Sequence, residues 1–498
     1  MTRSHQRAAE ISARVPSPQR SARKDEGLSA ARGVHADGPP GGRRAGRGRG
    51  RGGIGTSKVR VRTILRLLSG ILLCGVLLAG GAGAAERVYI DIDSPNFQKF
   101  PLAVADFYAL SPGPEGAELS RELARSLSEM LEITRYVHLI PPEAFLEDPA
   151  RADSTLRGTH FPDWRAVGAE YLVKGAYQVR GRNLTVDFRL FDVVRGEIVR
   201  DRRFTGTLAE RKDMVRKFAG EILFALTGEG GVFDTKIAFV LKTGRQGEIH
   251  TVNFDGSGLS RLTQWHSLTL SPRWSPGGRY LTYTSYRDGN PDLYVQSYPG
   301  GAAKKIAAFP GLNLAGPWSP DGKRLLLTLS RDGNQEIYAM SLEDGRLQRL
   351  TYNAAIDVSP AWSPDGRRIA FVSNRSGSPQ IYIMDREGGD VRRLTFDGGY
   401  NTSPAWSPKG DRIAYEGRVN GNFQIHTIRE DGSEPTLLTT DPGDHESPSW
   451  SPDGRYLAFS VRGGAKGQVC VMNANGTGRR VLVEAEGCLT PAWSPRLR

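Results

Sequence analysis

The sequence predicts an α/β N-terminal domain followed by an all-β, six-bladed β-propeller. A Trp-Ser-Pro motif recurs through the second half of the chain at intervals of 43 or 44 residues, whereas residues 86 to about 230 mix helical and strand periodicity. A fixed repeat of about 40–45 residues with one Trp per unit is typical of propellers built from four-stranded blades. The tryptophans of the motif are Trp274, Trp318, Trp362, Trp406, Trp450 and Trp493.

The unit around Trp362 shows the physical basis of the repeat. Its Ser-Pro-Asp-Gly segment suits a type I turn, because Pro presets φ at the second position and Gly is favoured at the last. Two alternating strands follow, at 368–373 and 380–384, and polar residues with glycine bound each of them. We interpret the Trp as packed between neighbouring blades rather than stacked on a ligand, because every unit carries it.

The two ends of the repeat region predict how the ring closes. Residues 237–263 form a unit without its Trp-Ser-Pro strand, and residues 490–495 form that strand with nothing after it. Joined, the two fragments make one blade, which leaves no blade without its inner strand. We therefore expect the propeller to span 231–498, its first blade to depend on 488–498, and no catalytic domain to follow the last motif.

The net charge of +13 lies almost entirely at the N-terminus, where residues 1–66 hold 16 Lys/Arg and 4 Asp/Glu. The Arg/Gly-rich residues 1–57 predict a disordered leader. Residues 58–84 combine basic residues, an apolar run and a small-residue cleavage site, which predicts a secretory signal peptide. Because a signal peptide belongs at the N-terminus, we hypothesise that the leader comes from a start site assigned too early. The rest of the chain is close to neutral, so the basic balance says nothing about its partners, and we expect no nucleic-acid partner.

The three cysteines leave two questions open. Cys74 suggests a lipoprotein, but Leu73 stands where a small residue is needed before a lipidated Cys, so lipidation is disfavoured. Cys470 and Cys488 remain after cleavage, in a context that permits a disulfide. Unpaired thiols are the favoured interpretation for cysteines in a strand and a nearby loop, with the disulfide as the alternative.

Residues 85–230 predict a compact α/β domain, in which strands alternate with two amphipathic helices. Leu119, Leu123, Leu127 and Leu131 recur at helical spacing in the first helix. A glycine-rich linker at 228–231 leads into the propeller. The expected elements are strands at 87–92 and 102–107, a helix at 118–131, strands at 171–177, 184–190 and 197–200, and a helix at 209–226.

The sequence contains no motif of a known catalytic or metal site. It has no G-x-S-x-G, H-E-x-x-H, Cys-x-x-Cys, P-loop or Rossmann signature. His250 and His426 occupy matching positions of different units and are interpreted as packing residues, and the Asp-Gly pairs as hairpin turns rather than calcium loops. We therefore predict no enzyme, cofactor or metal. An exported enzyme or sugar-binding protein with a loop-built site is the alternative.

The connections that lead into the Trp-Ser-Pro strands predict a protein-binding face. All six open on the same side of the propeller, around its channel, and carry mixed polar and apolar residues without a catalytic cluster. Replacing Asn313, Asp357 and Val358 by Ala is expected to weaken partner binding with little change in melting temperature. The predicted face comprises Thr269, Asn313, Ala315, Asp357, Val358, Asn401, Thr402, His445 and Glu446.

From about residue 85 to its end, the chain resembles the TolB family of the Tol-Pal system. The resemblance rests on the Trp-Ser-Pro-Asp-Gly repeats, on 235–240, on 491–495 and on the α/β domain before the propeller. It implies WD40-like TolB-type repeats and a periplasmic protein without enzymatic activity. It also implies binding of the lipoprotein Pal through the propeller, with a role in outer-membrane integrity and envelope constriction at cell division. Other outer-membrane proteins are further candidate partners, and a monomer is expected outside the complex.

The mature N-terminus is a second predicted binding segment, for which the resemblance implies TolA as partner. The segment alternates apolar and charged side chains before Ser94-Pro95-Asn96 breaks the strand. Such a strand can dock permanently on its own domain or be released to pair with a partner. Its residues are Glu86, Arg87, Val88, Tyr89, Ile90, Asp91, Ile92 and Asp93.

Overall fold

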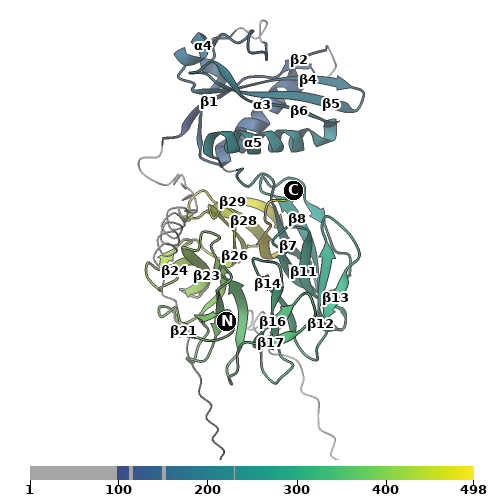
Figure 1. Ribbon diagram of the computed structural model, residues 1–498, viewed down its shortest axis with the longest axis vertical. Coiled ribbons are helices and arrows are strands. Elements are labelled where there is room, and N and C mark those ends of the chain that lie inside the picture. The colour runs from purple at the N-terminus through teal and green to yellow at the C-terminus, as the bar shows by residue number, and fades with distance from the viewer. Residues whose placement is uncertain (1–97, 112–115, 148–152, 229, 498) are drawn as a thin grey trace, which may run out of the picture. The chain divides into compact units, whose positions relative to one another are not determined.

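The computed structural model describes residues 98–111, 116–147, 153–228 and 230–497 (Figure 1). The first part is an α/β domain that combines helices with one mixed sheet. Its elements are β1 (Phe100–Val104), β2 (Tyr108–Ala109), α3 (Gly116–Ile133), β3 (Val137–Leu139), α4 (Phe161–Ala166), β4 (Tyr171–Arg180), β5 (Asn183–Asp192), β6 (Glu197–Thr207) and α5 (Arg211–Thr227), with 3-10 turns at Pro142–Ala144 and Leu208–Glu210.

The sheet of this domain is mixed and has the order β3-β1-β4-β5-β6, with β2 added beside β4. Helices α3 and α5 pack together on one face, where the rings of Phe188 and Phe218 lie 4.7 Å apart. Trp164 of α4 belongs to a separate apolar cluster with Leu172 and Phe191, and Figure 1 shows α4 and α5 on opposite sides of the sheet. None of the described helices combines the length and the apolar character that a membrane crossing requires.

The four predicted strands that fall within the described residues of this domain all differ in their bounds from the observed ones. The first begins at Phe100 and ends at Val104, so it does not reach Phe107. Those predicted at 171–177 and 184–190 extend over Tyr171–Arg180 and Asn183–Asp192. The strand predicted at 197–200 continues to Thr207 as β6. This continuation is polar apart from Phe204, which packs against Phe188, so it carries no period-2 hydrophobic pattern. Pairing with β5 along its full length holds it, for example through the two hydrogen bonds from Arg203 to Asp187 at 2.6 and 2.8 Å.

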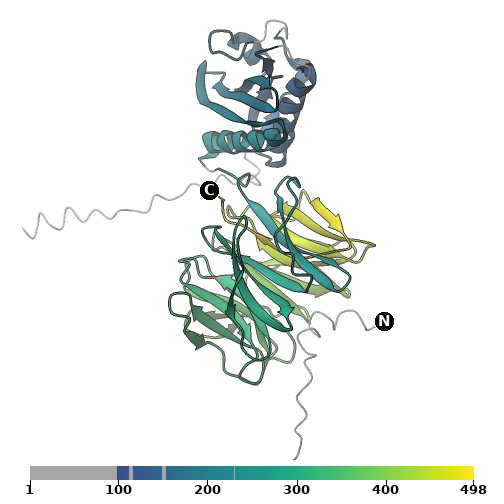
Figure 2. The same ribbon diagram turned by 90° about the vertical axis from the view of Figure 1, so that its right-hand side faces the viewer.

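The second part of the chain forms six four-stranded antiparallel sheets, each of which is one blade of a propeller (Figures 1 and 2). From inner to outer strand they are blade 1, β30 (Gly487–Trp493), β7 (Lys236–Thr243), β8 (Gln246–Asn253), β9 (Ser260–Arg261); blade 2, β10 (Thr269–Trp274), β11 (Tyr280–Asp288), β12 (Asn290–Ser297), β13 (Lys304–Ala307); blade 3, β14 (Asn313–Trp318), β15 (Arg324–Leu329), β16 (Glu336–Ser341), β17 (Leu347–Arg349); blade 4, β18 (Asp357–Trp362), β19 (Arg368–Ser373), β20 (Gln380–Asp385), β21 (Arg392–Arg393); blade 5, β22 (Asn401–Trp406), β23 (Arg412–Val419), β24 (Asn422–Arg429), β25 (Thr436–Leu437); and blade 6, β26 (Asp444–Trp450), β27 (Tyr456–Arg462), β28 (Gly467–Asn473), β29 (Arg480–Ala485).

The ring closes at blade 1, as the sequence predicts. The C-terminal strand β30 is its inner strand and pairs antiparallel with β7, where Trp493 lies opposite Ile237. The inner strands of successive blades contact each other around the ring, and β26 of blade 6 contacts β30. Both ends of the propeller therefore contribute to one sheet, which leaves no blade without its inner strand.

The repeated tryptophans join each blade to the preceding one. Trp362 packs against Leu326 and Ile337 of blade 3, and the indole N–H of Trp274 donates to the carbonyl of Ala492 in blade 1 at 3.0 Å. Trp318, Trp406 and Trp450 make equivalent contacts with blades 2, 4 and 5. A large flat side chain at this position buries much apolar area between two sheets, which explains the period of the motif.

The Ser-Pro-Asp-Gly segment forms the predicted tight turn. In blade 4 the N–H of Gly366 donates to the carbonyl of Ser363 at 2.9 Å, and Gly366 has φ of 68°. The inner strands also contain a feature that was not predicted, a β-bulge shortly before each Trp. The bulge residues Ser271, Ser359, Ser403, Ser447 and Thr490 adopt positive φ, a conformation that bends the strand and redirects the side chains before it.

Candidate functional site

The face that carries the connections from each outer strand to the next inner strand is the candidate site. We call it the connection face. Because the strands of a blade are antiparallel, the hairpins between its two middle strands lie at the same end, and the Ser-Pro-Asp-Gly turns lie at the opposite end. The connections are residues 262–268, 308–312, 350–356, 394–400, 438–443 and 486.

Six of the nine side chains predicted for this face are buried inside it. Thr269, Asp357 and His445 are 0% exposed, Asn313 and Asn401 are 1% and 2% exposed, and Ala315 is 6% exposed. Val358, Thr402 and Glu446 are half-buried. Of the nine, only these last three expose side-chain surface on this face.

The buried asparagines close the connections that precede them. The Asn313 side chain donates to the carbonyl of Phe309 at 2.7 Å and accepts the N–H of Phe309 at 3.0 Å. Asn401 donates to the carbonyl of Asp397 at 2.8 Å and to Gln380 at 2.9 Å. A residue five positions before the Trp therefore braces a loop, and its replacement by Ala is expected to destabilise the blade.

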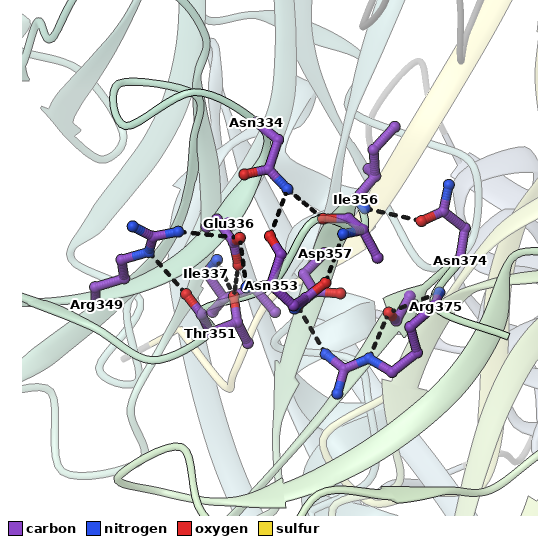
Figure 3. Close-up of polar contacts among 12 residues, drawn as sticks. Asn334, Glu336, Ile337, Arg349, Thr351, Asn353, Ile356, Asp357, Asn374 and Arg375 are labelled. Atoms are coloured by element: carbon purple, nitrogen blue, oxygen red, sulfur yellow. Dashed lines mark hydrogen bonds and ion pairs between the residues drawn. The ribbon is translucent and has the colours of Figure 1, made fainter.

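Figure 3 shows how the connection between blades 3 and 4 is anchored by Glu336. This carboxylate is fully buried. It accepts a hydrogen bond from the hydroxyl of Thr351 at 2.5 Å and one from the guanidinium of Arg349 at 3.1 Å. Thr351 in turn accepts the N–H of Ile337 at 2.9 Å. Burial of a carboxylate is tolerable only with such hydrogen bonds and a counter-ion.

The far end of the same connection is anchored by Asp357. Its carboxylate accepts hydrogen bonds from Nδ2 of Asn353 at 2.6 Å and from Nη2 of Arg375 at 2.8 Å (Figure 3). Asn334 donates to the carbonyl of Asn353 at 3.0 Å, and Asn374 accepts the N–H of Ile356 at 2.8 Å. Both ends of this loop and its middle are therefore tied to strands and hairpins of two blades.

Other blades repeat the anchor formed by Glu336, with either a carboxylate or a neutral amide at its position. In blade 1 Thr263 donates to Glu248 at 2.5 Å, and Arg261 pairs with the same carboxylate at 3.2 Å. In blade 4 the position of Glu336 holds Gln380, which accepts the hydroxyl of Thr395 at 2.8 Å. The Arg-Leu-Thr ending of the repeat is thus a loop anchor, in which the Thr hydroxyl points inward.

A second group of ionisable side chains links blades 5 and 6. Glu416 of β23 is buried and accepts the N–H of Ser447 of β26 at 2.6 Å. Burial, with repulsion from Glu446, raises the pKa of Glu416 to about 7. Glu446 is itself paired with Arg462. Burial also lowers the pKa of His445, whose Nε2 lies 3.3 Å from Asp441.

The most exposed hydrophobic side chains of this face are ones that the sequence reasoning missed. Tyr352 is 70% exposed, Phe396 is 71% exposed and Ile356 is 39% exposed. The predicted residues are those at fixed positions shortly before each Trp. Tyr352 and Phe396 lie earlier in the connection, directly after Arg-Leu-Thr. The Arg-Leu-Thr motif could have indicated these positions. Successive side chains of an extended segment point to opposite sides, so an inward Thr places the next side chain on the outside.

The remaining predicted features are placed as follows. Cys470 and Cys488 are buried free thiols, and burial raises the pKa of Cys470 to about 12 and that of Cys488 to about 11. His250 and His426 pack beside the rings of Phe239 and Tyr415. No group of three or more potential metal ligands occurs among the described residues. The leader, the signal peptide, Cys74 and the segment 86–93 lie outside them.

Comparison with known proteins identifies both domains. The family pattern described as "TolB beta propeller domain" matches residues 224–497, and that described as "TolB amino-terminal domain" matches residues 88–199. The crystal structure of TolB from Acinetobacter baumannii superposes with a TM-score of 0.67 at 28% identity, covering 80% of this chain and 97% of that one.

Curated relatives agree with this assignment. The Tol-Pal system protein TolB of Syntrophus aciditrophicus (strain SB) is 52% identical over 235 residues, which are 46% of this chain and 52% of that protein. Its counterpart in Desulfosudis oleivorans (strain DSM 6200 / JCM 39069 / Hxd3) is 41% identical over 211 residues, 42% of this chain and 48% of that protein. The chain spans about half the length of these curated relatives. Because the propeller pattern alone matches more than half of the chain, the chain belongs to the TolB family.

Proposed function

We propose that this protein is the periplasmic, non-enzymatic binding component of a Tol-Pal system. Its connection face binds Pal, its N-terminal segment 86–93 binds TolA, and the two contacts support outer-membrane integrity and envelope constriction during division. The observation that carries the proposal is the braced connection face, in which buried polar networks hold the loops while apolar side chains stay exposed. Pre-organised loops with exposed aromatic groups are typical of protein-binding surfaces.

The proposed location rests on the family and on the signal-peptide pattern of residues 58–84. A near-neutral body gives no support for a nucleic-acid partner. We expect cell fractionation to recover the protein in the periplasm, with a mature N-terminus near Ala85. Recovery in the cytoplasm with residues 1–57 still attached would contradict both the location and the start-site hypothesis.

The test of the binding function is calorimetric titration of the mature protein with the periplasmic domain of Pal. We expect a saturable one-to-one complex from a protein that sediments as a monomer on its own. Parallel assays for hydrolase activity and for oligosaccharide binding address the alternative class of propeller. Activity or sugar binding without Pal binding would overturn the proposal.

A further inference from the structure

The exposed hydrophobic side chains are confined to one sector of the connection face. Tyr352 and Ile356 lie on the connection between blades 3 and 4, and Phe396 lies on the next one, between blades 4 and 5. The positions that correspond to Tyr352 in the other blades hold small or polar residues, such as Gln264, Ala308 and Thr440. The remaining exposed large hydrophobics of the propeller lie on outer strands or at the opposite end of the blades.

Each aromatic ring of this sector is covered on one side by the arginine that precedes it. The guanidinium of Arg349 lies 4.7 Å from the Tyr352 ring centre, and that of Arg393 lies 4.9 Å from the Phe396 ring centre. The same guanidinium groups donate to the loop carbonyls of Thr351 at 2.8 Å and Thr395 at 2.6 Å. Each ring is therefore held in place while most of its surface remains in water, which lowers the entropy lost when a partner covers it.

The two arginines differ in their counter-ions. Arg349 pairs with Glu336 beneath it, whereas Gln380 occupies the corresponding position beneath Arg393. Within the part of the chain that the structure describes, Arg393 makes no ion pair. A partner that covers Phe396 must leave Arg393 solvated or supply a carboxylate, because a desolvated guanidinium without a counter-ion is unfavourable.

We propose that the energy of partner binding is concentrated in the sector of Tyr352, Ile356 and Phe396. The partner that covers this sector is a folded protein. Its contacting surface carries an aliphatic patch, and a carboxylate at the border of that patch pairs with Arg393. This inference rests on the proposed function, in which Pal is the partner. It assigns the contact to blades 3–5 rather than to the channel-lining residues of all six blades. Aromatic and arginine side chains held in rigid loops are the residue types that dominate interface energies.

The test is titration of the Pal periplasmic domain into the unchanged protein and two double variants. Tyr352→Ala with Phe396→Ala should weaken the complex roughly 100-fold, because two anchor side chains are lost. Leu259→Ala with Val391→Ala removes two other exposed hydrophobic side chains, 52% and 40% exposed, at the opposite end of the blades. This matched control should bind within about twofold of the unchanged protein, because isolated exposed side chains contribute little.

A third variant measures how much the charge of Arg393 contributes to binding, apart from the apolar contacts. Arg393→Gln should weaken binding several-fold at low ionic strength and by less at high ionic strength, because salt screens the carboxylate. All variants are checked for an unchanged melting temperature. If the unchanged protein binds Pal and the aromatic double variant binds equally well, the sector assignment is wrong while the proposed function stands. If the unchanged protein does not bind Pal, both fail together.

Discussion

At the scale of single residues, the position five residues before each Trp is structural rather than partner-facing. Asp357 is 0% exposed and holds Asn353 and Arg375 on two different segments. A variant that replaces Asn313, Asp357 and Val358 together therefore disturbs folding, and a loss of binding in it would not locate an interface. The corrected set for binding studies is the exposed one.

Replacing Asp357 by Ala is expected to lower the free energy of unfolding by about 2–3 kcal/mol, because the Arg375 guanidinium and the Asn353 amide lose a shared acceptor. Urea unfolding of the purified protein measures the change. Ser376→Ala, an exposed neighbour of Arg375, serves as the control and should change the unfolding free energy by less than about 0.5 kcal/mol. Equal stability of the two variants would mean that the network of Asp357 does not brace the loop.

Glu416 predicts a pH dependence of stability. Its pKa in the folded protein is raised from 4.5 to about 7, so the folded state binds more protons than the unfolded state between these values. Stability should therefore fall as the pH rises from about 5 to 7. Glu416→Gln keeps an acceptor for the N–H of Ser447 and removes the titration, so it should flatten this slope.

Denaturant titrations at pH 5, 6, 7 and 8 test the prediction for Glu416. Glu343→Gln, which removes an exposed carboxylate from a turn, is the matched control and should keep the slope of the unchanged protein. A slope that persists in Glu416→Gln would assign the pH dependence to other titratable groups.

At the scale of elements, the sequence predicts the ring well and the loops poorly. Six blades, the seam at β30 and β7, and the helices α3 and α5 all follow from periodicity, which packing imposes on every unit. The polar continuation of β6 has no hydrophobic period that sequence reasoning could detect. The anchor positions of Glu336 and Asp357 do recur in other blades, for example at Gln380 and Asn401, but a repeated polar residue does not reveal that its side chain points inward. The anchors arise from hydrogen bonds between neighbouring strands, hairpins and loops, such as that of Asn374 with Ile356, 18 residues apart.

The seam supports a further prediction at this scale. Deleting residues 488–498 removes most of β30, so β7 loses its inner partner and blade 6 loses the strand that it packs against. We expect aggregation or a broad, non-cooperative thermal transition, because the truncated ring has unpaired strand edges.

Light scattering and calorimetry of the truncated protein measure this effect. A synthetic peptide of residues 486–498, added during refolding, should restore a sharp transition because it can pair with β7 in trans. A truncated protein that stays soluble and melts like the complete chain would show that β30 is dispensable for closure.

At the scale of the whole molecule, the protein offers one proposed site on the propeller and one at its mature N-terminus. The segment Ala85 to Asn96 alternates apolar and charged residues and then ends at a Ser-Pro break. If Pal occupancy changes how readily this strand is released, one molecule couples the partners anchored in the two membranes. A coupling of binding free energies is reciprocal, so Pal must alter TolA affinity by the same factor as TolA alters Pal affinity.

We expect the TolA periplasmic domain to bind the mature protein and to lose most of its affinity for a form that begins at Phe97. Saturating Pal should shift the TolA affinity of the complete form by roughly 5- to 150-fold, the usual range of allosteric coupling, and leave the shortened form unaffected. Titrations of TolA with and without Pal, and of Pal with and without TolA, measure both directions. Equal TolA binding by the two forms would make the segment a permanently docked strand. If Pal does not change the affinity for TolA, the coupling proposal is wrong, even if the segment does bind TolA.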